Sequence, residues 1–494
     1  MLLGIDVGTG GTRAVVIDES GQVLASSSAD HEPFAIPQPG WAEQSPQDWW
    51  RACGIAVRKV LIDSGLNKNA ISCVGFSGQM HGAVLLDAND EVIRPAIIWC
   101  DQRTEKQSHE LCDLFGTDQL IHLTCNPPLT NFTLTKLLWV RERESGNWRR
   151  FRHLLLPKDY VRFRLTGERA IDVADASGTL LLDVAGRKWS VDVMCRTGIK
   201  DDVLPSLHES VGICGQVSAA GAEATGLKIG TLVVAGAGDQ AAGAVGMGIV
   251  QPGSVSATIG TSGVVFAATN RPALDPKGRV HTFCHAVPGR WHVMGVTQAA
   301  GLSLRWFADQ MTECRGEDRY EELTRQASSA PAGAGGVIWL PYLMGERTPH
   351  LDPNARGALL GLSAGHTSAH VLRAILEGVA FSLKDSFTIF DEMRVPVERV
   401  RLGGGGARST LWRQIQADVY EREVEVLTAE EGAAYGAAIL AGVGGRMWSS
   451  VDEACCTVVR VAQKIAPNPG STPVMQESYQ RFRKSYPALR AAFA

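Results

Sequence analysis

Several common sequence features are missing from this chain of 494 residues. No Cys-x-x-Cys pair occurs among its 11 cysteines, which argues against a zinc site or a disulfide scaffold and favours a reducing compartment. No Gly-Lys dipeptide occurs, so the Gly-x4-Gly-Lys-Ser/Thr phosphate loop is excluded. Neither sign of charge dominates. The 48 lysines and arginines stand against 52 aspartates and glutamates, which removes the electrostatic reason for a nucleic-acid or anionic-membrane partner.

Long apolar runs are missing as well. The first ten residues have neither the basic region nor the long apolar core of a signal peptide. The most apolar stretch, residues 232–250, carries Asp239 near its centre, where a lone charge would be costly in lipid. We therefore expect a soluble, cytoplasmic protein without membrane contact.

Glycine is abundant, at 53 residues, and two glycine turns belong to a repeated pattern. In each copy an apolar strand, a glycine turn, a returning strand, a helix and a further strand follow one another. The first copy comprises residues 2–7, 8–11, 14–17, 48–64 and 71–76, and the second comprises residues 254–259, 260–263, 264–267, 370–389 and 400–402. The pattern predicts an α/β protein of two similar domains, residues 1–247 and 248–494, facing a shared cleft.

The two turns have the form Gly-Thr-x-Gly and lie between strands, so they do not fit a Rossmann pocket, which needs a strand and a helix. Consecutive backbone N–H groups in such a turn form a nest for anions, and Thr9, Thr12 and Thr261 add hydroxyl groups. An ordinary hairpin explains either turn alone. Two such turns in matching positions favour phosphate binding.

Two carboxylates follow buried strands. Asp6 lies beside the first glycine turn, where it could hold Mg²⁺, although a turn-capping role explains it too. Asp239 follows the predicted strand 231–235 and precedes a run of glycine and alanine, which leaves room for a ligand. It could accept a proton from a hydroxyl that attacks a phosphate. Helix N-capping explains Asp239 equally well.

Two polar loops are candidates for binding a sugar. Residues 79–82 place an amide, a thioether and an imidazole after a buried strand, although a single histidine is often only structural. Residues 99–103 combine the aromatic face of Trp99 with Asp101 and Arg103, which suits a polyol. A surface turn with an ion pair is the alternative for this second loop.

Taken together, these motifs resemble the FGGY carbohydrate kinases, and most closely the members that phosphorylate D-xylulose. The resemblance covers nearly the whole chain. It is carried by residues 4–9, 40–44, 48–50, 78–82, 155–160, 236–243, 343–349, 357–362, 370–377 and 432–438.

The resemblance implies an actin-like fold of two domains with ribonuclease-H-like cores, and transfer of phosphate from ATP to the terminal hydroxyl of D-xylulose. Asp239 would be the general base, and Asp6 and Asp239 would be associated with Mg²⁺. Sugar contacts are expected from the first domain, at Gln79, Met80, His81, Gly82, Trp99, Asp101, Arg103, Asp239 and Gln240. Family members carry either Asn or Gln at the position of Gln240. Nucleotide contacts are expected at Gly8, Thr9, Gly11, Thr12, Arg13, Gly260, Thr261, Gly404, Gly405, Gly406 and Ala407, the last four against the adenosine.

Two other functions stay open. A related kinase could act on another pentulose or a polyol, and an actin-like ATPase could use the same cleft as a switch for protein partners. The sugar-ligand loops favour the kinase. Expected partners are ATP and a small sugar, without nucleic acid or membrane, and a homodimer is a further expectation.

Overall fold

The computed structural model describes residues 1–316, 318–428 and 432–493. Its first large sheet has the strand order β13-β14-β5-β1-β2-β3, with the short β15 also paired to β5. These strands are β1 (Leu2–Val7), β2 (Gly11–Ile17), β3 (Val23–Asp30), β5 (Cys73–Gly78), β13 (Ile213–Gln216), β14 (Leu232–Val234) and β15 (Ala237–Gly238). β5 runs parallel to β1, β14 and β15, so the carboxyl ends of these strands meet at one edge of the sheet.

The second large sheet has the order β18-β19-β17-β16-β22-β23-β24. Its strands are β16 (Gly253–Ile259), β17 (Gly263–Thr269), β18 (His281–Cys284), β19 (Trp291–Thr297), β22 (Val397–Gly404), β23 (Val424–Leu427) and β24 (Val461–Ile465). The antiparallel strands β16, β17 and β19 match β1, β2 and β3, and β22 lies parallel to β16 as β5 lies parallel to β1. The predicted repeat is therefore confirmed.

Helices α1 (Pro46–Asp63) and α13 (Ser368–Glu392) occupy the matching positions before β5 and β22. Each buries an apolar side, which includes Trp49 and Val57 in α1 and Leu372 and Val379 in α13. A helix in this position is the usual connection between parallel strands, because such strands cannot be joined by a tight hairpin. Both helices were predicted from their periodicity, to within a few residues.

Strand alternation gives the first sheet two apolar faces. Leu3 and Ile5 share one core with α1, whereas Leu2 shares another core with α10 (Asp239–Gly246) and α15 (Gly432–Gly444). Helix α15 lies so close to the sheet that a Cβ atom on Gly4 or Gly75 would overlap the backbone of α15. Glycine is therefore required at both positions.

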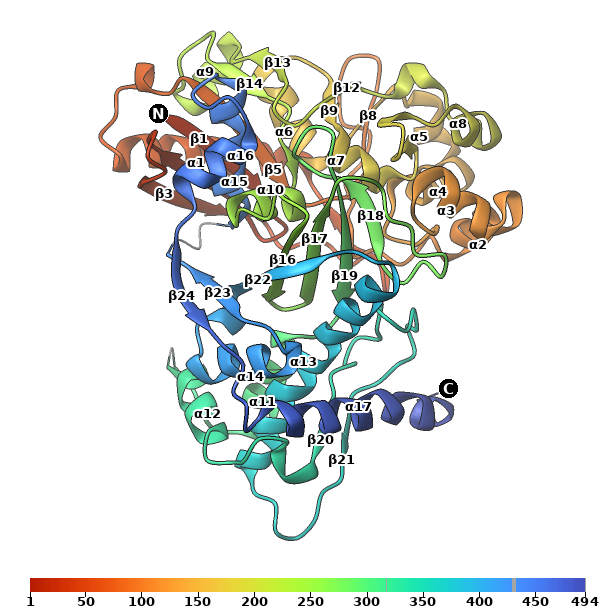
Figure 1. Cartoon of the computed structure of the whole chain (residues 1–494). Coiled ribbons are helices and arrows are strands. Elements are labelled where there is room, and N and C mark those ends of the chain that lie inside the picture. Colours follow the sequence, from red (N-terminus) through yellow and green to blue (C-terminus); the bar gives the residue numbers. More distant parts are fainter. Residues whose placement is uncertain (317, 429–431, 494) are drawn as a thin grey trace.

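The chain thus crosses between the two sheets more than once. It passes from α10 to β16 near residue 250, and it returns after β23 with α15 and α16 (Val451–Val458), drawn in blue beside the red strands in Figure 1. The sequence pattern did not foresee this return. The boundary between residues 247 and 248 stays a prediction.

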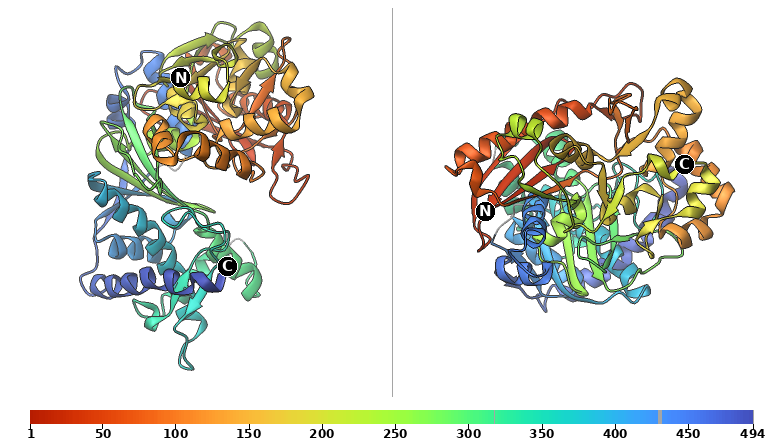
Figure 2. Two further views of the ribbon diagram at one scale, coloured as in Figure 1. Left: turned by 90° about the vertical axis from the view of Figure 1, so that its right-hand side faces the viewer. Right: turned by 90° about the horizontal axis from the view of Figure 1, so that it is seen from above.

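The remaining elements form two lobes, one around each sheet (Figures 1 and 2). In the upper lobe lie β4 (Glu43–Gln44), β6 (Val84–Leu86), β7 (Ala96–Ile97), α2 (Glu105–Phe115), α3 (Thr117–Thr124), α4 (Thr133–Arg143), α5 (Ser145–Arg150), β8 (His153–Leu155), α6 (Pro157–Thr166), β9 (Ala170–Asp172), α7 (Val173–Ala176), α8 (Val191–Thr197), β12 (Ser206–His208) and α9 (Ala219–Thr225). In the lower lobe lie α11 (Gly301–Met311), α12 (Arg319–Ala327), β20 (Ile338–Leu340), β21 (Ala358–Leu360), α14 (Thr410–Tyr420) and α17 (Thr472–Phe493).

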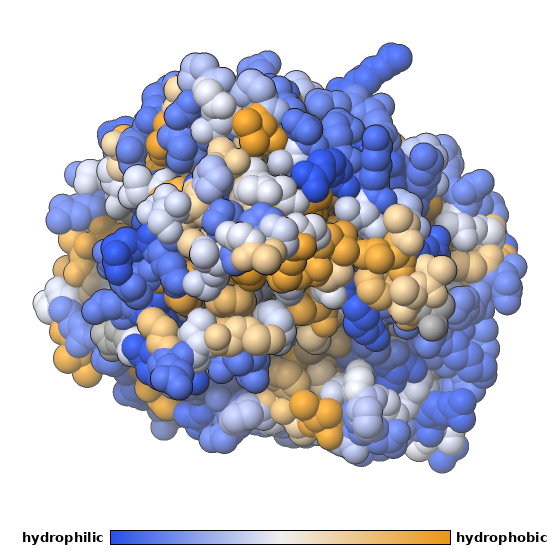
Figure 3. Space-filling model, turned by 90° about the horizontal axis from the view of Figure 1, so that it is seen from below, coloured by the Kyte–Doolittle hydropathy of each residue, from blue (hydrophilic) through white to orange (hydrophobic). Residues whose placement is uncertain are grey.

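Figure 3 shows the molecule from below, where apolar side chains gather in a band around a hollow. Within the described residues, no helix is both long enough and apolar enough to cross a membrane.

Candidate active site

Three polar side chains gather where parallel strands of the first sheet end. Asp6 lies next to the last residue of β1, Gln79 follows β5, and Asp239 follows β15. In the register, Asp6 pairs with Ser77, and Ser77 pairs with Ala237, so the three strand ends are adjacent. Ligands bind at such carboxyl ends because the loops there leave a crevice.

The two carboxylates influence each other. Burial and, to a smaller extent, the negative charge of Asp6 raise the pKa of Asp239 to about 7. Burial also raises the pKa of Asp6. A hydrogen bond from Ser77 and the positive charge of Arg13 lower this pKa, but by less than burial raises it. The Oδ1 atom of Asp6 is buried and has no hydrogen-bond partner among the described residues. Two such carboxylates suit proton transfer and cation binding.

Asp239 is the first residue of α10, and Gly238 occupies the N-cap position. Asp239 is therefore not the N-cap of this helix, which was the alternative role considered from the sequence. A Cβ atom on Gly238 would lie 2.8 Å from Cγ of Met80, so glycine lets the start of the helix approach the sugar loop. Asp239 and Gln240 are both half-buried at this junction.

The glycine turn between β1 and β2 is held from several directions. Gly8 N donates to Gly11 O at 3.0 Å, and Gln44 Nε2 donates to Thr9 O at 2.8 Å. Trp99 Nε1 donates to Thr9 Oγ1 at 2.9 Å. Thr12 is fully buried and shares a hydrogen bond of 2.9 Å with His31, which argues against a phosphate contact by its hydroxyl.

The loop after β5 is joined to the same turn. Gln79 is buried, and its Nε2 donates to Gln44 Oε1 at 3.0 Å and to Gly8 O at 3.3 Å. His81 has a positive φ of 67° and donates from Nδ1 to Gly178 O at 2.8 Å. This bond orients the imidazole, and Nε2 forms no hydrogen bond within the described residues. A Cβ atom on Gly82 would lie 2.6 Å from Pro157, which explains the glycine.

The second predicted sugar loop has an internal role in this structure. The Arg103 guanidinium pairs with Asp101 at 2.7 Å and with Glu43 at 2.7 Å, and it stacks 3.7 Å from the ring centre of Trp41. The Asp101 side chain is fully buried and also accepts from Ala42 N at 2.6 Å. The alternative considered for this loop, an ion pair on a surface turn, is therefore half right: the ion pair forms, but it is buried.

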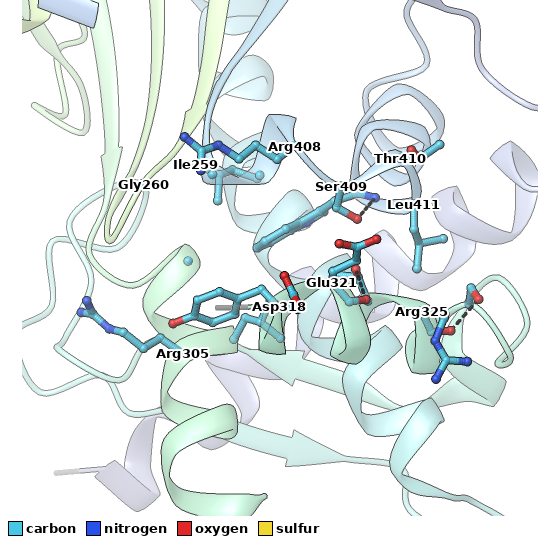
Figure 4. Close-up of a pocket in the computed structure, with 18 of the residues that line it drawn as sticks. Ile259, Gly260, Arg305, Asp318, Glu321, Arg325, Arg408, Ser409, Thr410 and Leu411 are labelled. Atoms are coloured by element: carbon cyan, nitrogen blue, oxygen red, sulfur yellow. Dashed lines mark hydrogen bonds between the residues drawn. The ribbon is translucent and has the colours of Figure 1, made fainter. Parts of the chain in front are cut away.

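A pocket of about 820 Å³ opens in the lower lobe (Figure 4). The turn at Gly260 and Thr261 lines it, together with Gly405 and Gly406 after β22. Gly404 and Ala407 flank this lining: Gly404 has a φ of +71° and bends the chain against Ile259, and Ala407 is fully buried. The nucleotide contacts predicted in two distant segments, at Gly260 and Thr261 and at residues 404–407, therefore lie together in the structure.

Helices from other segments complete the pocket. Arg305 comes from α11, Tyr320 and Glu321 come from α12, and Arg408 and Trp412 come from the start of α14 and the residues before it. Figure 4 places Arg305 and Arg408 toward the end where Gly260 lies, and Glu321 and Arg325 toward the other end. Sequence reasoning missed these residues, and no local motif marks them.

Comparison with known proteins agrees with this geometry. Residues 1–246 match the model of the N-terminal domain of the FGGY family of carbohydrate kinases, and residues 255–445 match its C-terminal domain. This chain belongs to the FGGY family of carbohydrate kinases. The chain is thus an ATP-dependent carbohydrate kinase, and the predicted two-domain α/β fold of the actin-like type is confirmed.

Several members of the family resemble this FGGY kinase along almost its whole length. A xylulose kinase of Bacillus subtilis (strain 168) is 38% identical over 485 residues, which cover 98% of this chain and 96% of the relative. A xylulose kinase of Escherichia coli (strain K12) is 38% identical over 492 residues and 99% of both chains. The crystal structure of xylulose kinase from Rhodospirillum rubrum superposes with a TM-score of 0.92 at 31% identity, covering 100% of this chain and 99% of that one.

Proposed function

We propose that this FGGY kinase transfers the terminal phosphoryl group of ATP to the terminal hydroxyl of D-xylulose, which forms D-xylulose 5-phosphate. The observation that carries the proposal is the full-length similarity, at 38% identity, to proteins named xylulose kinase. The loop at residues 79–82 supports it, because Met80 lies against Gly238, the neighbour of Asp239, and the loop's side chains suit a small polyhydroxylated ligand.

The sugar contacts in this proposal come from Met80, His81, Asp239 and Gln240. His81 supports such a role because its Nδ1 is held by Gly178 O while its Nε2 is left without a protein partner. Gln79 acts differently, because its buried amide joins the sugar loop to the Gly8–Gly11 turn. Asp101 and Arg103 support the loop from inside through their ion pair.

The nucleotide occupies the pocket of the lower lobe in this proposal. The adenosine lies against Gly405 and Gly406, and the phosphates lie near Gly260 and Thr261, where Arg305 and Arg408 bring positive charge. The Gly8–Gly11 turn with Arg13 contacts the phosphate from the upper lobe. Backbone N–H groups in such turns favour anions because several of them converge on one point.

Asp239 acts as the general base. As the sugar hydroxyl oxygen attacks the γ-phosphorus, the hydroxyl proton passes to a carboxylate oxygen of Asp239, and the bond between the γ-phosphorus and ADP breaks. A base works best when its pKa lies near the pH of the reaction, and burial raises the pKa of Asp239 to about 7.

Asp6 and Asp239 are also suited to Mg²⁺. The buried, unpartnered Oδ1 of Asp6 and the mutual repulsion of the two carboxylates fit a divalent cation. No group of three or more His, Cys, Asp or Glu side chains arranged for a metal occurs in the described residues. Magnesium in kinases needs only one or two carboxylates, because phosphate oxygens and water complete its shell. When bound, the ion would offset the charge of the phosphates.

An ADP-release assay over D-xylulose, D-ribulose, L-ribulose, glycerol and gluconate tests the proposal. We expect the highest kcat/KM with D-xylulose. A higher value with another compound would reject the substrate while keeping the kinase, and ATP turnover that ignores every sugar would favour the ATPase switch. The domain boundary, a homodimer and a cytoplasmic location remain predictions.

A further inference from the structure

Arg347 lies on a loop between β20 and β21 that is tied to the end of β19. Its neighbour Glu346 is buried and accepts through Oε1 from Gln298 N at 2.9 Å and from Arg347 N at 2.7 Å. On the other side, Thr348 N donates to Val296 O at 3.0 Å, and Val296 N donates to Thr348 Oγ1 at 3.0 Å. These bonds fix the backbone on both sides of Arg347.

The same stretch of chain supports the phosphate turn of the lower lobe. Shortly after Gln298, Ala300 N donates to Thr261 O at 3.0 Å and Gly301 N donates to Gly260 O at 2.8 Å. Thr297, the last residue of β19, pairs with Gly263 at the other end of the turn. Arg347 therefore rests on the structural unit that carries Gly260 and Thr261.

The Arg347 side chain forms no ion pair with a carboxylate in the part of the chain that the structure describes, although the charge of its neighbour Glu346 acts on it. It is partly buried, and among the described residues its guanidinium forms neither a hydrogen bond nor an ion pair. Other arginines of the same lobe are matched, such as Arg373 with Glu377 at 2.6 Å and Arg401 with Glu425 at 3.0 Å. A partly buried guanidinium without an anion is costly, so one that is carried on a held backbone indicates a ligand that supplies the negative charge.

The positive charge of Arg347 acts on two residues of the upper lobe, His81 and Lys136. Burial lowers the pKa of His81, and Arg347 is among the charges that lower it further. Burial lowers the pKa of Lys136 to about 7, and Arg347 acts in the same direction. Lys136 Nζ donates to His81 O and Asn131 O, both at 2.8 Å, and forms no ion pair with any described carboxylate. The Arg347 charge therefore lies close enough to the sugar loop to act on His81 and Lys136.

We propose that Arg347 is a catalytic residue of this kinase, whose guanidinium contacts the phosphoryl group as it passes from the nucleotide to the sugar hydroxyl. The inference rests on the proposed kinase reaction and adds a group from the lower lobe to it. A guanidinium presents several N–H donors in a planar fork that matches phosphate oxygens. Charge spreads over these oxygens during transfer, so donors fixed at this point lower the barrier.

The experiment compares Arg347→Ala and Arg347→Lys with the wild-type enzyme, using whichever sugar the wild type phosphorylates best. Failure of D-xylulose as a substrate therefore leaves this test intact. We expect kcat of Arg347→Ala to fall by about 10²–10³-fold, as for loss of a fixed donor to a developing charge. The KM for the sugar should stay within about threefold, and added guanidinium should restore part of kcat. Arg347→Lys keeps the charge without the fork and should lose at least tenfold.

A second measurement separates contact with the phosphoryl group from support of the fold. By calorimetry, the sugar phosphate produced by the wild type should bind Arg347→Ala at least tenfold more weakly, while the free sugar binds equally well. Arg356→Ala is the matched control, because Arg356 is an exposed arginine on the same loop that bonds only the nearby carbonyls of Pro353 and Ala355. It should behave as wild type.

A kcat of Arg347→Ala within threefold of wild type would overturn the proposal. So would equal weakening of sugar and sugar phosphate binding. If Arg347→Ala does not fold, a kcat of Arg347→Lys within threefold of wild type overturns it instead.

Discussion

At the scale of single residues, Asp239 offers the sharpest prediction. Asp239→Asn keeps the size of the side chain but cannot accept a proton, so kcat should fall by about 10²-fold or more. Sugar binding, measured by calorimetry, should survive because the amide can still form hydrogen bonds. Asp192→Asn is the control, since Asp192 is an exposed aspartate in the first turn of α8. A nearly normal kcat in Asp239→Asn would leave Asp239 with a structural role alone.

The sequence predicted those candidate site residues that lie at the ends of strands, and it did not predict those that lie elsewhere. Asp6, Asp239 and the turns at Gly8 and Gly260 were predictable because strand ends and glycine turns leave a local pattern. Arg305 and Tyr320 carry no such pattern, because only tertiary packing brings their helices to the pocket. Asp101 and Arg103 show the opposite problem: the same residue types serve a sugar ligand or a buried ion pair.

At the scale of elements, the contact between α13 and α17 makes stability depend on pH. Tyr479 donates to the buried Asp385 at 2.7 Å, and burial raises the pKa of Asp385 to about 7, against opposition from Tyr479, Arg483 and Lys384. The unfolded chain releases this proton near pH 3.8, whereas the folded chain keeps it until about pH 7. The free energy of unfolding should therefore fall as the pH rises between these values, by up to ~1.4 kcal/mol per pH unit.

Asp385→Asn isolates this effect, because its amide oxygen still accepts from Tyr479 and carries no titratable proton. Urea unfolding at several pH values between 4 and 8 should show the wild type losing stability relative to the variant up to about pH 7, with a constant difference above it. Parallel curves for the two proteins at every pH would exclude the assigned titration.

At the scale of the whole molecule, the separation of the predicted sugar and nucleotide contacts between two lobes implies closure. Phosphoryl transfer needs the reacting atoms to approach within about 3–3.5 Å, and closure excludes water as a competing acceptor. Small-angle scattering should give a smaller radius of gyration with sugar and a non-hydrolysable ATP analogue together than without ligands. An unchanged radius at saturation with both ligands would contradict the predicted movement.

The structure indicates which part of the molecule moves in such a closure. His81 and Phe132 of the upper lobe pack against Phe283 of β18, so this side of the second sheet is anchored to the sugar loop. We therefore expect the motion in the helices at the far end of the lower lobe, which line much of the pocket of about 820 Å³. The sequence predicted two domains that meet near residue 247, but no local pattern marked the aromatic contacts between them.

The return of α15 to the first sheet has a consequence for how the protein is made. β1 is synthesised more than 400 residues before α15, the helix that covers its second apolar face. Until α15 has been made, the nascent chain therefore presents a half-covered sheet, with Leu2, Val15 and Cys73 among the side chains left bare. A gene fragment that stops before α15 encodes an upper lobe that cannot close its own core.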